Sequence, residues 1–238
     1  MQHNKSLLIK NPLIIALDVD TQEKAIDLAI ELEDIAGAYK LGPRLIHRYG
    51  KDLTLKIAKL APVFVDCKFF DIPSTMEAAV RASFDSGASL VTVHALAGQE
   101  ALLRLAKVEK ELSEIRPFKI LCVTILTSWD QQSLPPVMKA QPISSHVKDL
   151  ANLVQNAGLT GIVCSPEELD LLQGQGLYLV TPGIRFDLQS AGDQKRTMGP
   201  GEAMQKGASA LVVGRPIIES SSPKEAAMDF SISILNKK

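Results

Sequence analysis

The chain has 238 residues, 46% of them hydrophobic, and a formal net charge of −1 at pH 7. This length, without a linker-like stretch, fits one large domain over residues 1–238 better than two small ones. The near-neutral charge excludes an electrostatic footprint for nucleic acid or an anionic membrane, and no apolar stretch reaches transmembrane length, so we expect a cytoplasmic protein without nucleic-acid or membrane partners.

The first half of the chain alternates apolar strands with amphipathic helices. Residues 13–19 form a buried-type strand that ends in an acid, Asp18, and Thr21 then caps a helix. Three more strands are expected over residues 38–42, 63–70 and 90–95. The helices that follow them are expected over residues 43–59, 74–86 and 98–112.

The second half continues the alternation. We expect strands over residues 118–126, 161–165, 177–183 and 210–215, and helices over residues 144–157, from Pro166 for a short stretch, and over 223–235. The segments 128–142 and 184–198 are predicted to be long loops. Eight strands alternating with helices favour a (β/α)8 TIM barrel, with eight parallel strands and outer helices, over an open doubly wound sheet.

Cys67, Cys122 and Cys164 all lie in apolar strand-like runs. An odd count without C-x-x-C spacing argues against a disulfide framework or a zinc site. We therefore expect three core cysteines in a reducing compartment.

The third predicted strand carries the most unusual charges. Asp66 and Lys68 are two residues apart, so in a regular strand their side chains share one face, about 7 Å apart. The alternate positions in 63–69 are almost wholly apolar, as expected for the face of a strand that is covered by helices. The charged pair is therefore expected on the opposite face, inside the barrel. Asp71 has the other parity and can face a neighbouring subunit. The alternative is an ordinary salt bridge on a half-exposed strand.

Other unusual residues also follow strand ends, where barrels of this class place their active sites. Ser128 has a hydroxyl at this predicted mouth, although capping its own loop is a simpler role for it. His94 ends a strand and is a candidate base, but a lone histidine there is more often a near-core residue, and we assign it no catalytic role. The strand-end set comprises Asp18, Lys40, Asp66, Lys68, Asp71, Thr127, Arg185 and Arg215.

The last two strands end in a pattern typical of phosphate binding. Residues 181–185, Thr-Pro-Gly-Ile-Arg, and the pair Gly214-Arg215 lie where such barrels hold a phosphate with backbone N–H groups and a guanidinium. A surface ion pair is the alternative for either arginine alone. The loop 184–198 is a candidate lid, and Gln194 within it is a candidate to bridge the two ends of a ligand.

Together these motifs resemble a known family. The run Asp66-x-Lys68-x-x-Asp71-Ile72-Pro73-x-Thr75 is similar to the signature of the orotidine 5′-phosphate decarboxylases. The resemblance extends in order over nearly the whole chain, through Leu17-Asp18, Lys40-x-Gly42, Leu126-Thr127-Ser128, Thr181 to Arg185, Gly192-Asp193-Gln194 and Gly214-Arg215. It implies a (β/α)8 homodimer that converts orotidine 5′-monophosphate to uridine 5′-monophosphate (UMP) and CO2 in de novo pyrimidine biosynthesis, without metal or organic cofactor.

The resemblance also implies a role for each matched residue. Lys68 is expected to donate a proton to C6 of the pyrimidine, within a charge network of Lys40, Asp66 and Asp71. The implied substrate contacts are Asp18 and Lys40 to the ribose, Thr127 and Ser128 to the pyrimidine, and Pro182, Arg185, Gln194, Gly214 and Arg215 around the phosphate. Asp71, Ile72 and Thr75 are expected to complete the site of the neighbouring subunit.

Two other functions compete with this one. A metal-dependent sugar-phosphate lyase or synthase of the 3-hexulose-6-phosphate synthase type shares the Asp-x-Lys-x-x-Asp pattern, but its magnesium site needs a carboxylate where this chain has Lys40. A nucleotide-binding barrel that has lost its activity would show a broken charge network, and here all four members are present.

Overall fold

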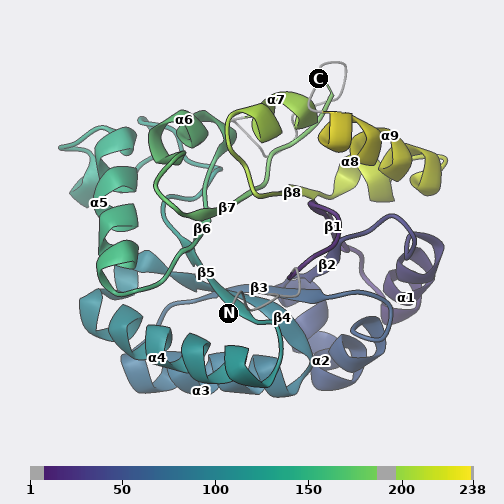
Figure 1. Cartoon of the computed structure of the whole chain (residues 1–238), viewed down its shortest axis with the longest axis horizontal. Helices are drawn as coiled ribbons and strands as arrows, with labels where there is room; N and C mark the ends of the chain where they lie inside the picture. The colour runs from purple at the N-terminus through teal and green to yellow at the C-terminus, as the bar shows by residue number, and fades with distance from the viewer. Residues whose placement is uncertain (1–7, 187–196, 237–238) are drawn as a thin grey trace, which may run out of the picture.

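The computed structural model of the chain describes residues 8–186 and 197–236. Eight parallel strands close into one barrel in chain order, and the helices surround it as an outer layer (Figure 1). The predicted (β/α)8 barrel is therefore confirmed. The strands are β1 Leu13–Ala16, β2 Ala38–Leu41, β3 Val63–Phe69, β4 Ala88–His94, β5 Lys119–Val123, β6 Gly161–Val163, β7 Tyr178–Thr181 and β8 Ala210–Val213.

The predicted helices are also present, with small shifts at their ends. Thr21 caps the first one as expected, because its hydroxyl accepts a hydrogen bond from the backbone N–H of Lys24. The α-helices are α1 Gln22–Glu31, α2 Pro43–Ile57, α3 Pro73–Asp85, α4 Gln99–Ile115, α5 Ile143–Asn156, α6 Leu169–Leu172, α7 Pro200–Gln205, α8 Arg215–Ile218 and α9 Pro223–Asn236. Short 3-10 turns cover Ala95–Ala97, Pro136–Met138 and Pro166–Glu168. Among the described residues, no helix combines the length and the apolarity needed to span a bilayer.

Two short helices were not predicted. Helix α7 has six residues and α8 has four, so neither shows a full period of apolar spacing from which a helix could be recognised. Several strands end earlier than predicted, as where the run 118–126 yields β5 ending at Val123. Apolar composition continues past the last ladder hydrogen bond, because the chain is still buried as it leaves the barrel wall.

Alternation along each strand divides the core into two layers. In β1, Leu13 and Ile15 pack outward against the helices, whereas Ile14 and Ala16 belong to the cluster inside the barrel. Ile9, ahead of the first strand, packs into the same inner cluster. Burying each such aliphatic side chain contributes about 1.5–3 kcal/mol.

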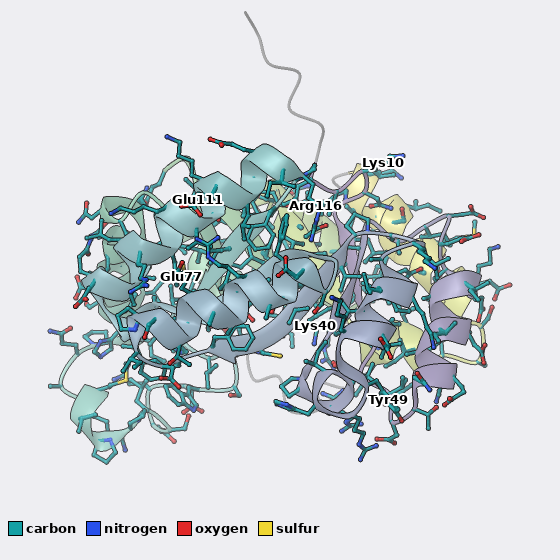
Figure 2. All side chains as sticks on the ribbon, turned by 90° about the horizontal axis from the view of Figure 1, so that it is seen from below. Lys10, Lys40, Tyr49, Glu77, Glu111 and Arg116 are labelled. Carbon is teal, nitrogen blue, oxygen red and sulfur yellow. The ribbon has the colours of Figure 1, made fainter. Side chains whose placement is uncertain are left out.

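The helix that follows β3 is tied to its neighbour by ion pairs. The Arg81 guanidinium lies 2.8 Å from Glu77 in α3 and 2.6 Å from Glu111 in α4, and Arg104 also pairs with Glu77. Figure 2 labels Glu77 and Glu111 on these two neighbouring helices. Because these groups are partly exposed, each pair is worth no more than about 1 kcal/mol. Their effect is to fix α3, and with it the loop between β3 and α3, against α4.

Candidate active site

A chain of charges crosses the C-terminal ends of the first three strands. Lys40 on β2 has its Nζ atom 3.2 Å from Asp18 Oδ1 and 3.5 Å from Asp66 Oδ2. Lys68 Nζ lies 2.9 Å from Asp66 Oδ1. Four of the residues singled out in the sequence are thus in direct contact, with Asp66 shared between two ammonium groups.

Gly42 and Gly214 border these ion pairs. A Cβ atom on Gly42 would lie 3.4 Å from Asp18 Oδ1 and 3.8 Å from Lys40 Nζ, and one on Gly214 would lie 3.9 Å from Asp18 Oδ2. These separations are ordinary van der Waals distances, so both glycines, each directly after a strand, lie against the ion pairs. The end of β8 is therefore next to Asp18.

The network keeps its two buried members, Lys40 and Asp66, charged. Burial alone would lower the pKa of Lys40, but the charges of Asp66 and Asp18 outweigh it and raise that pKa above its ordinary value. Burial alone would raise the pKa of Asp66, but Lys40, Lys68 and a hydrogen bond from Thr92 outweigh it and hold that pKa below its ordinary value. Asp66 is therefore an ionised carboxylate at neutral pH, paired with the Lys40 ammonium and with Lys68 Nζ 2.9 Å away.

Strand β3 is not regular where it carries Lys68. Val65 pairs with Val91 of β4 and Phe69 pairs with Val93, so residues 66–68 lie opposite Thr92 alone. Among the described non-glycine residues, only Lys68 has a positive φ, at 48°. The prediction of a regular strand to residue 70 is therefore wrong at this bulge, although the predicted pairing of Asp66 with Lys68 is present. The left-handed backbone costs about 1–2 kcal/mol, and bulges of this kind occur beside active sites.

Thr92 is the member of this network that the sequence analysis missed. It is fully buried in β4, its hydroxyl donates to Asp66 Oδ1 at 2.9 Å, and the backbone N–H of Lys68 donates to it at 2.9 Å. The available signal was weak: a polar residue of inward parity between Leu90 and His94 in a buried strand.

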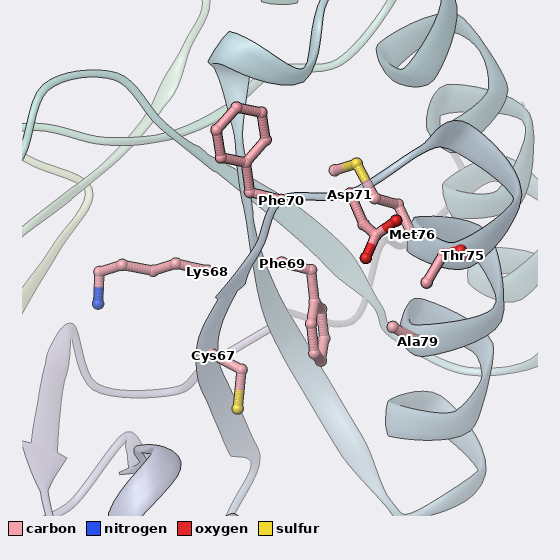
Figure 3. A pocket seen from close by; sticks show the side chains of 8 residues that line it. All are labelled: Cys67, Lys68, Phe69, Phe70, Asp71, Thr75, Met76 and Ala79. Carbon is pink, nitrogen blue, oxygen red and sulfur yellow. The ribbon is translucent and has the colours of Figure 1, made fainter.

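Asp71 lies apart from the network of its own chain. Its carboxylate accepts a hydrogen bond from the backbone N–H of Ile72 at 2.7 Å, and it points away from Lys68, toward α3 (Figure 3). Ile72 is 64% exposed, and Thr75 in the first turn of α3 is also exposed. This arrangement agrees with the prediction from strand alternation that the side chain of Asp71 points in a different direction from those of Asp66 and Lys68.

A cavity of about 320 Å³ lies beside this segment, between β3 and α3 (Figure 3). Lys68 extends from the strand to the side opposite Phe69, Asp71 and Thr75. The cavity is lined by Cys67, Lys68, Phe69, Phe70, Asp71, Thr75, Met76 and Ala79. Within this segment the side chain of Lys68 therefore lies on the other side of β3 from those of Phe69, Asp71 and Thr75.

His94 is a buried neighbour of the site rather than a charged one. Its Nδ1 accepts the backbone N–H of Leu96 at 3.3 Å, and its ring contacts that of Phe70 with centroids 5.5 Å apart. Burial lowers the pKa of His94, and the positive charge of Lys68 lowers it further. These contacts support the near-core interpretation of this residue.

The predicted phosphate side is only partly described. Gly214 precedes Arg215, which begins α8. Arg185 is buried after β7, and its backbone N–H donates to the carbonyl of Met198 at 3.1 Å. Pro182 directly follows β7, and Thr127 and Ser128 occupy a turn after β5. Gln194 and residues 187–196 of the predicted lid lie outside the described residues.

The cysteines are partly as predicted. Cys122 and Cys164 are buried, whereas Cys67 is half-buried and lines the cavity beside β3. Burial, followed by the charge of Asp66, raises the pKa of Cys67 to about 11. Cys67 lies within the bulge of β3 and beside the cavity, whereas Cys122 lies in β5 and Cys164 directly after β6.

The raised pKa of Cys67 predicts slow alkylation. Because the thiolate is the nucleophile, iodoacetamide at pH 8 is expected to modify Cys67 about 100-fold more slowly than free cysteine, with a rate that rises about tenfold per pH unit toward pH 11. Mass spectrometry of tryptic peptides measures this rate, with glutathione in the same tube as the reference thiol. Labelling of Cys67 as fast as glutathione at pH 8 would contradict the prediction.

Comparison with known proteins gives one consistent result. The model of the orotidine 5′-phosphate decarboxylase / HUMPS family matches residues 11–230. An orotidine 5′-phosphate decarboxylase of Paramagnetospirillum magneticum is 40% identical over 224 residues, which are 91% of this chain and 95% of the relative. Another, of Parasynechococcus marenigrum, is 41% identical over 222 residues, 90% of each chain.

Solved structures agree with the sequence relatives. The crystal structure of orotidine 5′-phosphate decarboxylase from Lactobacillus acidophilus superposes with a TM-score of 0.81 at 30% identity, covering 94% of this chain and 99% of that one. The residues matched by the family model, 11–230, include the strand ends that carry the charge network. The chain belongs to the orotidine 5′-phosphate decarboxylase / HUMPS family.

Proposed function

We propose that this chain is an orotidine 5′-phosphate decarboxylase, a carboxy-lyase that converts orotidine 5′-monophosphate to UMP and CO2 in pyrimidine biosynthesis. The observation that carries the proposal is the contact series Asp18–Lys40–Asp66–Lys68 at the barrel mouth. The family and its named relatives supply the reaction and the substrate. The enzyme acts as a single barrel domain in the cytoplasm.

The chemistry requires a charge such as that of Lys68. Loss of CO2 from C6 leaves an electron pair in the ring plane, which the ring π-system cannot delocalise. An ammonium group fixed beside C6 stabilises that charge as it develops and then transfers its proton to the carbon. Lys68, whose Nζ lies 2.9 Å from Asp66 Oδ1 and whose side chain is 39% exposed, is our candidate for this group.

Lys40 argues against the metal-dependent alternative. Its ammonium lies between Asp18 and Asp66, at 3.2 and 3.5 Å, and so occupies the centre of the acidic groups. A magnesium ion bound by those carboxylates would be repelled by this buried positive charge. The 3-hexulose-6-phosphate synthase type of reaction therefore fits this site less well.

The site is proposed to need two copies of the chain. Asp71 points away from its own Lys68, and the adjoining Phe70 and Ile72 are 61% and 64% exposed. Exposed apolar side chains next to a carboxylate are typical of a surface that becomes buried on assembly. In a homodimer, Asp71, Ile72 and Thr75 of one subunit complete the site of the other, with Asp71 joining the charge network there.

The other contacts follow the family pattern. Asp18 and Lys40 bind the ribose hydroxyls, and Thr127 and Ser128 bind the pyrimidine. The phosphate is held by Arg185, Arg215 and Gln194 with the backbone at Pro182 and Gly214. Binding energy from the phosphate, remote from C6, then contributes to the transition state.

Arg215 gives the sharpest test of the phosphate assignment. Arg215→Ala is expected to raise KM for orotidine 5′-monophosphate by about 100-fold, because a charge-assisted guanidinium–phosphate contact is lost. The affinity for the nucleoside uridine is expected to stay within about twofold, since it has no phosphate. Steady-state kinetics and calorimetry measure both, and an equal loss for nucleotide and nucleoside would refute the assignment.

The reaction itself is tested by product analysis. Purified protein incubated with orotidine 5′-monophosphate should release UMP and CO2 in equal amounts, measured by ion-pair chromatography and CO2 capture. Incubation with ribulose 5-phosphate and formaldehyde should give no hexulose phosphate. A hexulose phosphate product, with no UMP formed, would replace the proposal with its alternative.

A further inference from the structure

We infer that Thr92 is a positioning residue for the reaction, because its single hydroxyl fixes both the backbone of Lys68 and the carboxylate of Asp66. The inference rests on the proposed function, in which Lys68 is the proton donor. Thr92 itself is not placed against the substrate. It acts through the two residues that it holds.

The first step of the argument is the hydrogen-bond pattern. Thr92 Oγ1 donates to Asp66 Oδ1 at 2.9 Å and accepts the N–H of Lys68 at 2.9 Å, while Lys68 Nζ donates to the same Oδ1 at 2.9 Å. These contacts form a closed ring that joins the backbone and the side-chain end of Lys68. A hydroxyl can fill this place because it donates and accepts at once.

The second step is the irregular backbone. Residues 66–68 face Thr92 alone, so the regular ladder cannot hold the Lys68 N–H, and Lys68 takes a left-handed conformation that is unusual for a side-chain-bearing residue. The Thr92 hydroxyl replaces the missing ladder acceptor. It thereby selects the backbone conformation that directs the Lys68 side chain to the barrel mouth.

The third step separates an effect on the position of Lys68 from an effect on the stability of the fold. Thr92 is 0% exposed in a strand rich in β-branched residues, so valine, which has the same shape and a high strand preference, fits the fold. Thr92→Val removes the hydroxyl and leaves the packing. Thr92→Ser keeps the hydroxyl and removes a methyl group. Each variant therefore keeps the property, hydroxyl or packing, that the other one loses.

The expected result of Thr92→Val is a loss of turnover without a loss of binding. We expect kcat for orotidine 5′-monophosphate to fall about 10- to 100-fold, as for a reacting group misplaced by a fraction of an ångström to 1 Å, and KM to change by less than about threefold. The Kd of UMP, measured by calorimetry, is expected to change by less than about threefold. Thr92→Ser is expected to keep at least about a third of the wild-type kcat.

A matched control comes from the neighbouring strand. Thr124 follows β5, is also fully buried, and donates its hydroxyl to the carbonyl of Val163 at 3.4 Å, outside the charge network. Thr124→Val should therefore keep kcat within about twofold of wild type. Thermal unfolding of all three variants reports their folded fraction.

Amide hydrogen exchange gives a readout that does not depend on activity. In the nucleotide-free protein, the Lys68 N–H of Thr92→Val should exchange at least about tenfold faster than in wild type, and that of Thr92→Ser should not. Wild-type protein without turnover would refute the proposed function. If the wild type is active, any one of three results would refute the inference. These are a kcat of Thr92→Val equal to that of Thr124→Val, a loss of kcat in Thr92→Ser as large as in Thr92→Val, and an exchange rate of the Lys68 N–H that Thr92→Val leaves unchanged.

Discussion

Lys68→Ala is expected to lower kcat for orotidine 5′-monophosphate by at least about 10⁴-fold, because one side chain supplies both the charge that stabilises the developing carbanion and the proton that quenches it. The Kd for UMP is expected to change by less than about tenfold, since UMP has no carboxylate at C6. A stopped assay with excess enzyme measures the residual rate, and calorimetry measures the affinity.

The variant should remain folded. Without Lys68, the Asp66 carboxylate still faces Lys40 at 3.5 Å and still accepts the Thr92 hydroxyl at 2.9 Å, so no buried charge loses its last partner. Lys51→Ala, which removes an exposed lysine of α2, is the matched control and should be fully active. Turnover of Lys68→Ala within about tenfold of this control would refute the assignment of the proton donor.

Mixing two inactive variants is expected to restore activity if sites are shared between subunits. Lys68→Ala and Asp71→Ala each damage every site of their own homodimers. After subunit exchange in an equal mixture, about half of the dimers are mixed, and each mixed dimer has one site with both residues intact, so activity should rise to about a quarter of wild type. The measurement is kcat per subunit before and after exchange in mild denaturant.

The control for this experiment is a pair of variants whose changed residues both belong to the same subunit's part of the site. Asp66 and Lys68 are in contact within one chain, with Nζ and Oδ1 2.9 Å apart, so a mixture of Asp66→Asn and Lys68→Ala has a damaged residue in every site and should stay inactive. Recovery in the control mixture, or none in the Lys68→Ala and Asp71→Ala mixture, would show that Asp71 does not act across an interface.

Much of the site was predictable because it lies on regular elements. The inward parity of Lys40 and Asp66 follows from alternation along a strand, and the closed parallel barrel brings the ends of β1, β2 and β3 together. The charges themselves drew attention to these positions. Each one is costly in a buried strand unless it is paired.

The rest depended on contacts that local sequence does not encode. Nothing in residues 63–69 marks Lys68 for a left-handed backbone, which is determined by Thr92 on the next strand. Thr92 itself has the composition of an ordinary strand residue. The assignment of Asp71 to a partner's site concerns a second copy of the chain, and it stays a prediction.

The measurement that tests the central claim most directly is the rate of absorbance loss of orotidine 5′-monophosphate with purified protein, in the presence and absence of EDTA. The proposed mechanism, in which Lys68 and its carboxylate partners act alone, predicts decarboxylation at the same rate in both samples. No turnover, or turnover that EDTA abolishes, would contradict it.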